Sequence, residues 1–257
     1  MQLKPLEYLG RSLQSEVMDG VGITLSRYTH PEAQPWHFHE HLNVSLLLDG
    51  TFVDDSRELG QQPLKPLDMV VHPQGALHRS CPSGPGRLSL NLEPMVGWLE
   101  QHGFSRVEYR VSSVPELGIA AFQYLLGNES NMSDALLESL CPPDGQAETG
   151  YWFERVEDLI GQREDWTLSG LADALGVHPV YFARVFRARR GQSVTSFLRE
   201  RRLVRAANCL VRARSTGSEI ATRFGYSDEA HFSRHFRTVF GMSPTSAKKR
   251  FQIFNLN

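Results

Sequence analysis

The chain of 257 residues has few cysteines and no long apolar run. Its three cysteines, Cys81, Cys141 and Cys209, are isolated and odd in number, so they match neither a zinc-binding spacing nor a disulfide framework. Because no stretch of roughly 18 apolar residues occurs, no transmembrane helix is expected. Residues 1–7 also lack the apolar stretch of a signal peptide. These absences predict a cytoplasmic protein without membrane contact.

Acidic and basic residues are distributed unevenly between two parts of the chain. Residues 1–150 contain 9 Lys and Arg against 19 Asp and Glu, a net charge of −10. Residues 151–257 contain 18 against 10, a net charge of +8, and together the two parts give the −2 of the whole chain. This asymmetry indicates that only the C-terminal part meets a polyanion, and nucleic acid is the expected one.

One pattern occurs twice near the C-terminus. The first copy comprises Leu171–Gly176 and Phe182–Arg187, and the second comprises Ile220–Gly225 and Phe232–Arg237. The glycine that ends the first part of each copy suits a turn, because positive φ is cheap for glycine. The phenylalanines recur at helical spacing and predict a second helix that packs on the first. Each copy is therefore predicted to be a helix-turn-helix.

The segment 193–212 joins the two copies and has no Gly or Pro, so one helix is predicted. About 20 residues span roughly 30 Å, close to the roughly 34 Å between successive major-groove faces of B-DNA. One chain can therefore place two recognition helices in adjacent grooves. The predicted DNA contacts are the positions that face away from the phenylalanine core: Val180, Tyr181, Ala183, Arg184, Arg187, Arg190, Glu229, Ala230, His231, Ser233, Arg234 and Arg237.

These side chains are expected to divide between bases and phosphates. Arg pairs bidentately with guanine, Glu accepts from cytosine, and Val or Ala packs on a thymine methyl group. Arg184 and Arg234 are the expected base readers, whereas Arg187, Arg190 and Arg237 are better placed for phosphates. For any one arginine, a solvated or phosphate-only role is the alternative.

Residues 150–252 resemble the DNA-binding domain of the AraC/XylS family of bacterial transcription regulators, through the duplicated pattern, the joining helix and the stretch Phe232–Pro244. Two positions depart from the family pattern. His178 stands where Ser often caps the first recognition helix, and Ala247 stands where an aromatic residue is usual, a role that Phe251 can take. The resemblance implies a regulator that binds double-stranded promoter DNA, contacts RNA polymerase and activates transcription.

The part before this domain is strand-like up to about residue 93. Strands are expected over 22–28, 42–48, 51–53, 68–71 and 87–92, with a hairpin at Asp49-Gly50. Many short strands predict a sandwich or small barrel. Helices are then expected over 94–102, 115–126 and 131–140, and in the C-terminal part over 150–163, 169–175, 179–189, 193–212, 218–224, 228–239 and 244–252. The breaker-rich segment 141–146 divides the chain into predicted domains 1–145 and 150–257.

Histidines gather at positions 37, 39 and 41 and recur at position 78. In a strand, His37, His39 and His41 share one face because side chains alternate. We expect His37, His39 and His78 to converge inside a barrel. Three imidazoles so placed would suit Zn, Fe, Ni or Cu.

The spacing of His37, His39, Asn43 and Gly50 resembles the first cupin motif, and the segment Pro73–His78 resembles the second. The sensory domains of AraC-type regulators are cupin-like, so the resemblance implies a cupin-like barrel. Metal-binding cupins usually have a carboxylate where this chain has Asn43. The prediction is therefore a small-molecule effector site without metal, lined by His37, His39, Asn43 and His78. A purely structural role for the histidines is the alternative.

The sequence thus predicts two domains, an all-β cupin-like barrel with appended dimerisation helices and an all-α double helix-turn-helix domain. The expected function is an effector-responsive transcription regulator that acts as a homodimer through helices around 94–141, with no cofactor and no catalysis. One rival is a cupin metalloenzyme, such as a dioxygenase or isomerase, with a helical appendage. Another is an effector-independent regulator whose barrel only dimerises.

Overall fold

The computed structural model describes residues 1–29, 32–104, 106–128, 130–140, 155–156, 159–160, 166–212 and 215–255. It divides into an N-terminal unit (Met1–Ala121 and Ser130–Leu140) and a C-terminal unit (Phe122–Glu129 and Cys141–Asn257). The predicted linker 141–146 and most of the predicted helix 150–163 lie outside the described residues. None of the described helices is both long enough and apolar enough to cross a membrane.

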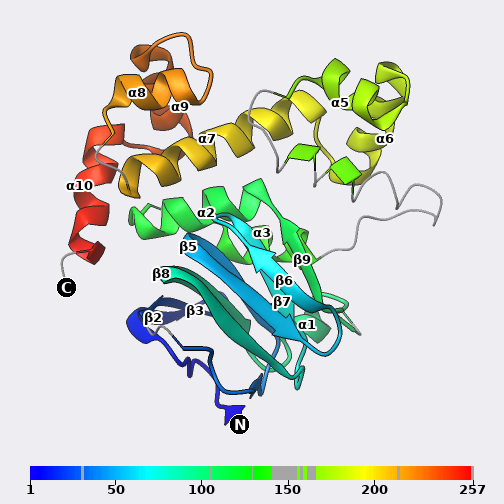
Figure 1. Cartoon of the computed structure of the whole chain (residues 1–257), viewed down its shortest axis with the longest axis vertical. Coiled ribbons are helices and arrows are strands. Elements are labelled where there is room, and N and C mark those ends of the chain that lie inside the picture. Colours follow the sequence, from blue (N-terminus) through cyan, green and yellow to red (C-terminus); the bar gives the residue numbers. More distant parts are fainter. Residues whose placement is uncertain are drawn as a thin grey trace. The chain divides into compact units, whose positions relative to one another are not determined.

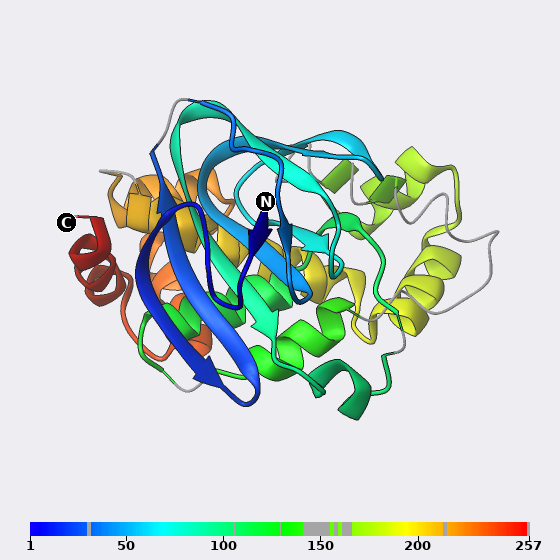
Figure 2. The same cartoon turned by 90° about the horizontal axis from the view of Figure 1, so that it is seen from below.

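A seven-stranded, strongly curved sheet dominates the N-terminal unit (Figures 1 and 2). Its strands pair in the order β2-β3-β8-β5-β7-β9, and β6 pairs with β5. Their bounds are β2 Arg11–Met18, β3 Val21–Tyr28, β5 Asn43–Ser56, β6 Gly60–Leu64, β7 Asp68–His72, β8 His78–Pro94 and β9 Arg110–Ser113. β1 (Gln2–Leu3) and β4 (Phe38–His39) form a separate parallel pair.

Apolar rows that cross three strands hold this sheet together. Leu90 of β8 lies between its register partners Leu25 of β3 and Leu46 of β5, and all three are at most 1% exposed. Burial of each such side chain contributes about 1.5–3 kcal/mol. The mostly-β N-terminal domain is thus confirmed. A closed barrel is not, because among the described strands β2 and β9 end the sheet without pairing with each other.

The hairpin predicted at Asp49-Gly50 is wrong. β5 continues through both residues, and its register with β8 shifts on either side of them. Gly50 has a φ of 82°, and a Cβ at this position would clash with the carbonyl oxygen of Gly86. A bulge and a tight turn both favour glycine with positive φ, so the dipeptide did not distinguish them.

Replacement of Gly50 by alanine is expected to destabilise the N-terminal unit by about 2–4 kcal/mol, because left-handed strain adds to overpacking. Urea unfolding of full-length protein measures this loss. Gly60→Ala is the matched control, since Gly60 has a φ of 66° but no atom lies within 4 Å of its built Cβ. It should lose only about 1 kcal/mol. Equal losses in the two variants would contradict the packing argument.

Three short helices of this part of the chain are α1 (Trp98–Gln101), α2 (Pro115–Leu125) and α3 (Met132–Leu140). They correspond to the predicted helices, although the sequence did not indicate β9. Leu117, Ala121 and Leu136 are buried within the monomer. These residues therefore do not form the exposed apolar face from which dimerisation was predicted, and the structure does not support dimerisation helices.

Helices alone make up the described C-terminal unit beyond residue 166, as predicted. They are α5 Leu168–Leu175, α6 Pro179–Arg190, α7 Val194–Arg212, α8 Gly217–Arg223, α9 Glu229–Phe240 and α10 Pro244–Asn255. Figure 1 shows α5 and α6 beside one end of α7, and α8 and α9 beside the other. The two helix-turn-helix units and the joining helix are thus confirmed as structural elements.

Polar caps and glycine turns explain where these helices begin and end. Asp228 caps α9 by accepting a hydrogen bond from the backbone N–H of His231, at 2.6 Å. At the start of α6 the imidazole Nδ1 of His178 accepts from the N–H of Val180 at 3.3 Å, so histidine fills the capping role of the expected serine. Gly176 and Gly225 both have a φ of 68° and form the predicted turns.

Phenylalanines form the core of each helix-turn-helix. The rings of Phe182 and Phe186 lie 5.8 Å apart in α6, and those of Phe232 and Phe236 lie 5.6 Å apart in α9, with both pairs at steep interplanar angles. All four side chains are at most 1% exposed. In α10, Phe251 is also buried, which is consistent with its predicted role in place of an aromatic residue at position 247.

Candidate DNA interface and histidine cluster

The outer face of α6 carries the first set of predicted DNA contacts. Val180 is 71% exposed and Tyr181 is 40% exposed, although both are large apolar side chains. The exposed guanidinium of Arg184 lies over the Tyr181 ring, 5.8 Å from its centroid. Ala183 is half-buried. This face therefore presents an apolar and a cationic group together, as a base-reading surface requires.

The outer face of α9 carries the second set. Glu229, Ala230, His231 and Arg234 are exposed, and Ser233 is half-buried. The Nδ1 of His231 hydrogen-bonds the hydroxyl of Ser227 at 3.1 Å, so the ring is held against the start of its own helix. Their exposure leaves these positions available for DNA, and their contact roles stay predictions.

The three predicted phosphate contacts differ from one another. Arg187 and Arg237 are exposed in the last turns of α6 and α9. Arg190 is half-buried, and its guanidinium lies 5.2 Å from the centroid of the Phe197 ring in α7. Arg190 therefore also packs α6 against α7.

In the N-terminal unit, His37, His39 and His78 converge as the sequence predicted. One ring nitrogen from each lies within 4.8 Å of the other two, and all three side chains are at most 4% exposed. Main-chain hydrogen bonds of 2.9 Å in both directions join His37 to His78, and His39 follows in β4. The side-chain alternation that would place His41 beside them stops at His39, and the Nδ1 of His41 lies 3.1 Å from Glu93 instead.

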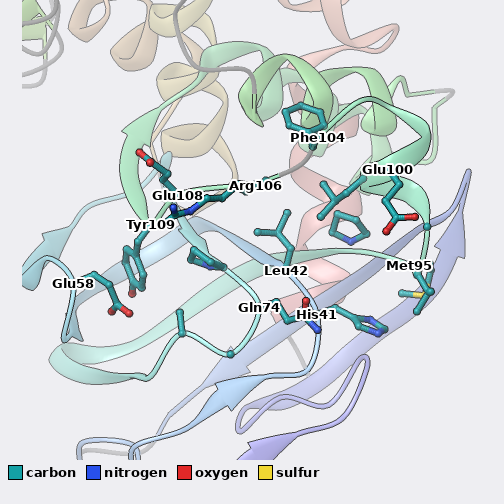
Figure 3. Close-up of a pocket in the computed structure, with 18 of the residues that line it drawn as sticks. His41, Leu42, Glu58, Gln74, Met95, Glu100, Phe104, Arg106, Glu108 and Tyr109 are labelled. Atoms are coloured by element: carbon teal, nitrogen blue, oxygen red, sulfur yellow. The ribbon is translucent and has the colours of Figure 1, made fainter. Parts of the chain in front are cut away.

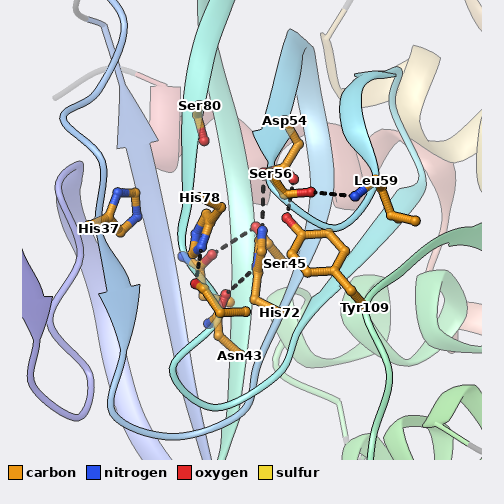
Figure 4. A network of polar contacts seen from close by, with 12 residues as sticks. His37, Asn43, Ser45, Asp54, Ser56, Leu59, His72, His78, Ser80 and Tyr109 are labelled. Atoms are coloured by element: carbon orange, nitrogen blue, oxygen red, sulfur yellow. Dashed lines mark hydrogen bonds and ion pairs between the residues drawn. The ribbon is translucent and has the colours of Figure 1, made fainter.

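A buried polar network lies beside these histidines (Figure 4). The His72 ring stacks on His78 with centroids 3.7 Å apart, and its Nε2 lies 3.1 Å from a carboxylate oxygen of Asp54. The other oxygen of Asp54 accepts a hydrogen bond from Tyr109. The sequence did not single out His72, Asp54 or Tyr109. His72 lies on β7, Asp54 on β5 and Tyr109 just before β9, so no shared motif joins them.

Asn43, predicted to bind an effector, belongs to this network. Its amide Nδ2 donates to the hydroxyl of Tyr8 at 3.1 Å, and its Oδ1 lies 3.4 Å from the Nδ1 of His72. Tyr8 in turn donates to Glu93 at 3.2 Å. Asn43 is 1% exposed and thus ties two parts of the network together.

Burial lowers the pKa values of the histidines in this region. Burial lowers the pKa of His39 to about 3, and the nearby rings of His72 and His37 add to the effect. Burial also lowers the pKa of His72 to about 3 and the pKa values of His37 and His78. The histidines are therefore neutral imidazoles at neutral pH, and a neutral imidazole has one N–H donor and one nitrogen lone pair.

A larger pocket of about 880 Å³ lies elsewhere in the same unit. Figure 3 shows Glu58, Glu108 and Tyr109 on one side of it and His41, Met95 and Glu100 on the other. Tyr109 thus lines this pocket and also donates to Asp54 in the buried network. This volume falls in the range of small-molecule sites, about 300–1,000 Å³. Nothing in the sequence pattern pointed to it, because its lining comes from several loops.

Two helix-turn-helix units, each with an exposed outer face on its second helix and joined by one long helix, define a double helix-turn-helix DNA-binding domain. A family model described as a helix-turn-helix domain matches residues 171–250. This match covers both units.

Curated relatives agree with this class. The chain is 35% identical to the HTH-type transcriptional regulator GlxA of Rhizobium meliloti over 38% of this chain and 30% of GlxA. It is 32% identical to the transposon Tn10 TetD protein of Escherichia coli over 37% of this chain and 64% of TetD. The C-terminal domain of AraT from Geobacillus stearothermophilus aligns at 31% identity over 37% of this chain and 82% of that chain, with a TM-score of 0.35.

The chain therefore spans less than two thirds of the length of these two curated relatives. Its C-terminal domain is similar to the helix-turn-helix domains of these transcription regulators.

Proposed function

We propose that this chain regulates transcription by inserting α6 and α9 into successive major grooves of promoter DNA. The observation that carries the proposal is the pair of exposed recognition faces at the two ends of α7. The 19 residues of α7 span about 28 Å at 1.5 Å per residue, comparable to the roughly 34 Å of one helical turn of B-DNA. A non-palindromic site of nearly two turns follows from this geometry.

Regulation by a ligand of the N-terminal unit is the second part of the proposal. Its support is the buried cluster of neutral histidines and the separate 880 Å³ pocket. A ligand changes DNA binding only if it binds one arrangement of the chain more tightly than another. A ligand with equal affinity for two arrangements does not shift the equilibrium between them. We also propose that the sheet has a cupin-like ancestry and that the protein activates transcription through RNA polymerase in the bacterial cytoplasm. The homodimer stays a prediction.

The rival role as a metalloenzyme has less support. The curated relative GlxA is named a transcriptional regulator, and a metalloenzyme role does not account for the duplicated helix-turn-helix units. We therefore propose that the N-terminal unit senses a ligand without turning it over.

Binding sites selected from random double-stranded DNA by the full-length chain provide the test. On the selected site, Arg184→Ala and Arg234→Ala are each expected to lose about 1–3 kcal/mol of discrimination at base pairs about one turn apart, if each guanidinium pairs with guanine. Arg187→Ala is the matched comparison, because a lost phosphate contact weakens all sequences alike. Failure to select any sequence, with the protein folded, would overturn the proposed function.

A further inference from the structure

We propose that the ligand sensed by the N-terminal unit is an organic cation with an apolar body, an amine or a quaternary ammonium compound, and that it binds in the pocket of about 880 Å³. This inference rests on the proposed function only for its effect on DNA binding. The site itself is argued from the side chains that line the pocket, all of which lie between His41 and Tyr109 in the N-terminal unit.

The volume of the pocket indicates the size of its occupant. Small-molecule sites measure about 300–1,000 Å³, and this pocket falls within that range. The cavity among His37, His39 and His78 has a volume of about 20 Å³, which is room for a single water, since a water needs about 10–15 Å³. We therefore assign a drug-sized organic ligand to the larger pocket.

Apolar side chains form part of the lining. Leu42 and Ala76 are buried, and Leu99 is half-buried. Two further lining side chains are apolar and exposed, because Val96 is 85% exposed and Leu59 is 40% exposed. Exposed apolar surface at a concave site is typical of ligand-binding grooves. A ligand with an apolar body would cover these side chains.

Carboxylates outnumber cationic side chains around the pocket. Glu58, Glu100 and Glu108 line it and are exposed, and no ion pair joins any of them to another described residue. Figure 3 shows Glu58 and Glu108 on one side of the pocket and Glu100 on the other. Arg106 is the only arginine or lysine among the described lining residues. A concave site with an excess of one charge attracts ligands of the opposite charge, here cations.

Two aromatic rings provide a second means of binding a cation. Phe104 is half-buried and Tyr109 is buried, and both line the pocket. Figure 3 shows the side chain of Glu58 beside Tyr109. The face of an aromatic ring attracts an ammonium group, and aromatic cages are a general device for recognising quaternary ammonium ligands. Rings and carboxylates in one pocket therefore favour an ammonium group over a carboxylate or phosphate.

Tyr109 connects the pocket to the sheet. Its hydroxyl donates to Asp54 in β5, and the chain continues directly from Tyr109 into β9, which pairs with β7. A ligand that packs against this ring therefore acts on β5 and β9 together. This connection gives binding at the pocket a physical route to the rest of the N-terminal unit.

Isothermal titration calorimetry of the full-length protein with two matched probes tests the proposal. Phenylbutylammonium and phenylpentanoate have the same apolar body and opposite charges. We expect one phenylbutylammonium to bind per chain, and phenylpentanoate to bind at least about 10-fold more weakly, because like charges repel it from the site. Added salt should reduce this difference, since it screens exposed charges.

Substitutions in the lining test where the cation binds. Glu100→Gln and Glu108→Gln should each weaken cation binding by about 2- to 5-fold, as expected for exposed charge pairs. Adding Glu58→Gln to both should remove most of the preference for the cation. Phe104→Leu keeps an apolar side chain without the ring, so it should weaken binding of the cation more than that of the anion. Glu16→Gln on β2 is the matched control, because Glu16 is exposed and does not line the pocket.

Three results would overturn the proposed site. Equal affinity for the two probes would overturn the assignment to cations. Absence of saturable binding of either probe at millimolar concentration would overturn the ligand site. Lining variants that bind phenylbutylammonium as tightly as Glu16→Gln does would overturn its location.

DNA binding by the same samples tests the regulatory part. Saturating phenylbutylammonium should change the affinity of the protein for the selected DNA site by roughly 5-fold or more, and the triple variant of Glu58, Glu100 and Glu108 should lose this response. Equal DNA affinity with and without the bound probe would overturn the regulatory role. Loss of specific DNA binding in every sample would instead overturn the proposed function.

Discussion

Raising the salt concentration from 50 to 200 mM is expected to weaken binding of the full-length chain to its DNA site by about 10³- to 10⁵-fold, if about 6–10 phosphates are neutralised. The reason is the release of counterions from DNA, which dilute salt favours and concentrated salt opposes. Arginines on the C-terminal unit supply the required charge, and the exposed ones include Arg184, Arg187, Arg199, Arg223, Arg234 and Arg237.

Fluorescence anisotropy of a labelled duplex at several potassium chloride concentrations measures this dependence. A plot of log affinity against log salt should have a slope of about −0.9 for each phosphate contact. Arg187→Ala and Arg237→Ala should each reduce the slope by about one contact. Arg57→Ala, which removes an exposed arginine of the N-terminal unit, should leave the slope unchanged. A slope shallower than about −2 would show that the basic face does not track the DNA backbone.

Replacement of Phe236 by alanine is expected to cost about 3–5 kcal/mol of stability in the C-terminal unit. The side chain is fully buried, and its ring lies 5.6 Å from that of Phe232 and 4.6 Å from that of Phe240. Removal of the ring leaves a cavity where the two helices of the second helix-turn-helix meet. Because a domain is stable by only about 5–15 kcal/mol, this loss removes a large fraction of the stability and should weaken specific DNA binding.

Hydrogen exchange measured by peptide mass spectrometry locates the effect. Peptides from α8 and α9 should lose protection, whereas peptides from β5 and β8 should keep it. Arg237→Ala is the neighbouring control, because this exposed side chain should change stability by less than about 0.5 kcal/mol while still weakening DNA binding. A Phe236→Ala protein with parental protection in α9 would contradict this account of the core.

The helical half could be predicted almost completely from the sequence. Helix patterns are local: caps, glycine turns and phenylalanines at three- and four-residue spacing stand close to one another along the chain. The predicted segments 179–189 and 228–239 therefore differ from α6 and α9 by only one residue at their ends. A local pattern also identifies which face is buried, and this is why the predicted contacts on α6 and α9 are exposed or half-buried in the structure.

The sheet was less predictable, because strand pairing joins residues far apart in sequence. Asp49-Gly50 satisfied the local rule for a hairpin, but whether the chain turns or bulges there depends on its pairing with β8, some 37 residues later, as in Gly50↔Arg87. The segment of β9 carries no strong alternation, so only its pairing with β7 identifies it as a strand.

The sequence by itself determined the helices of the C-terminal domain and the convergence of His37, His39 and His78, because recurring short spacings carry that information. Only the tertiary structure decided what surrounds the histidines. His72 stacks on His78, and Asn43 contacts Tyr8 and His72. The cavity that remains has a volume of about 20 Å³. A cavity is the space left after side chains from distant strands have packed. No spacing along the chain specifies that volume.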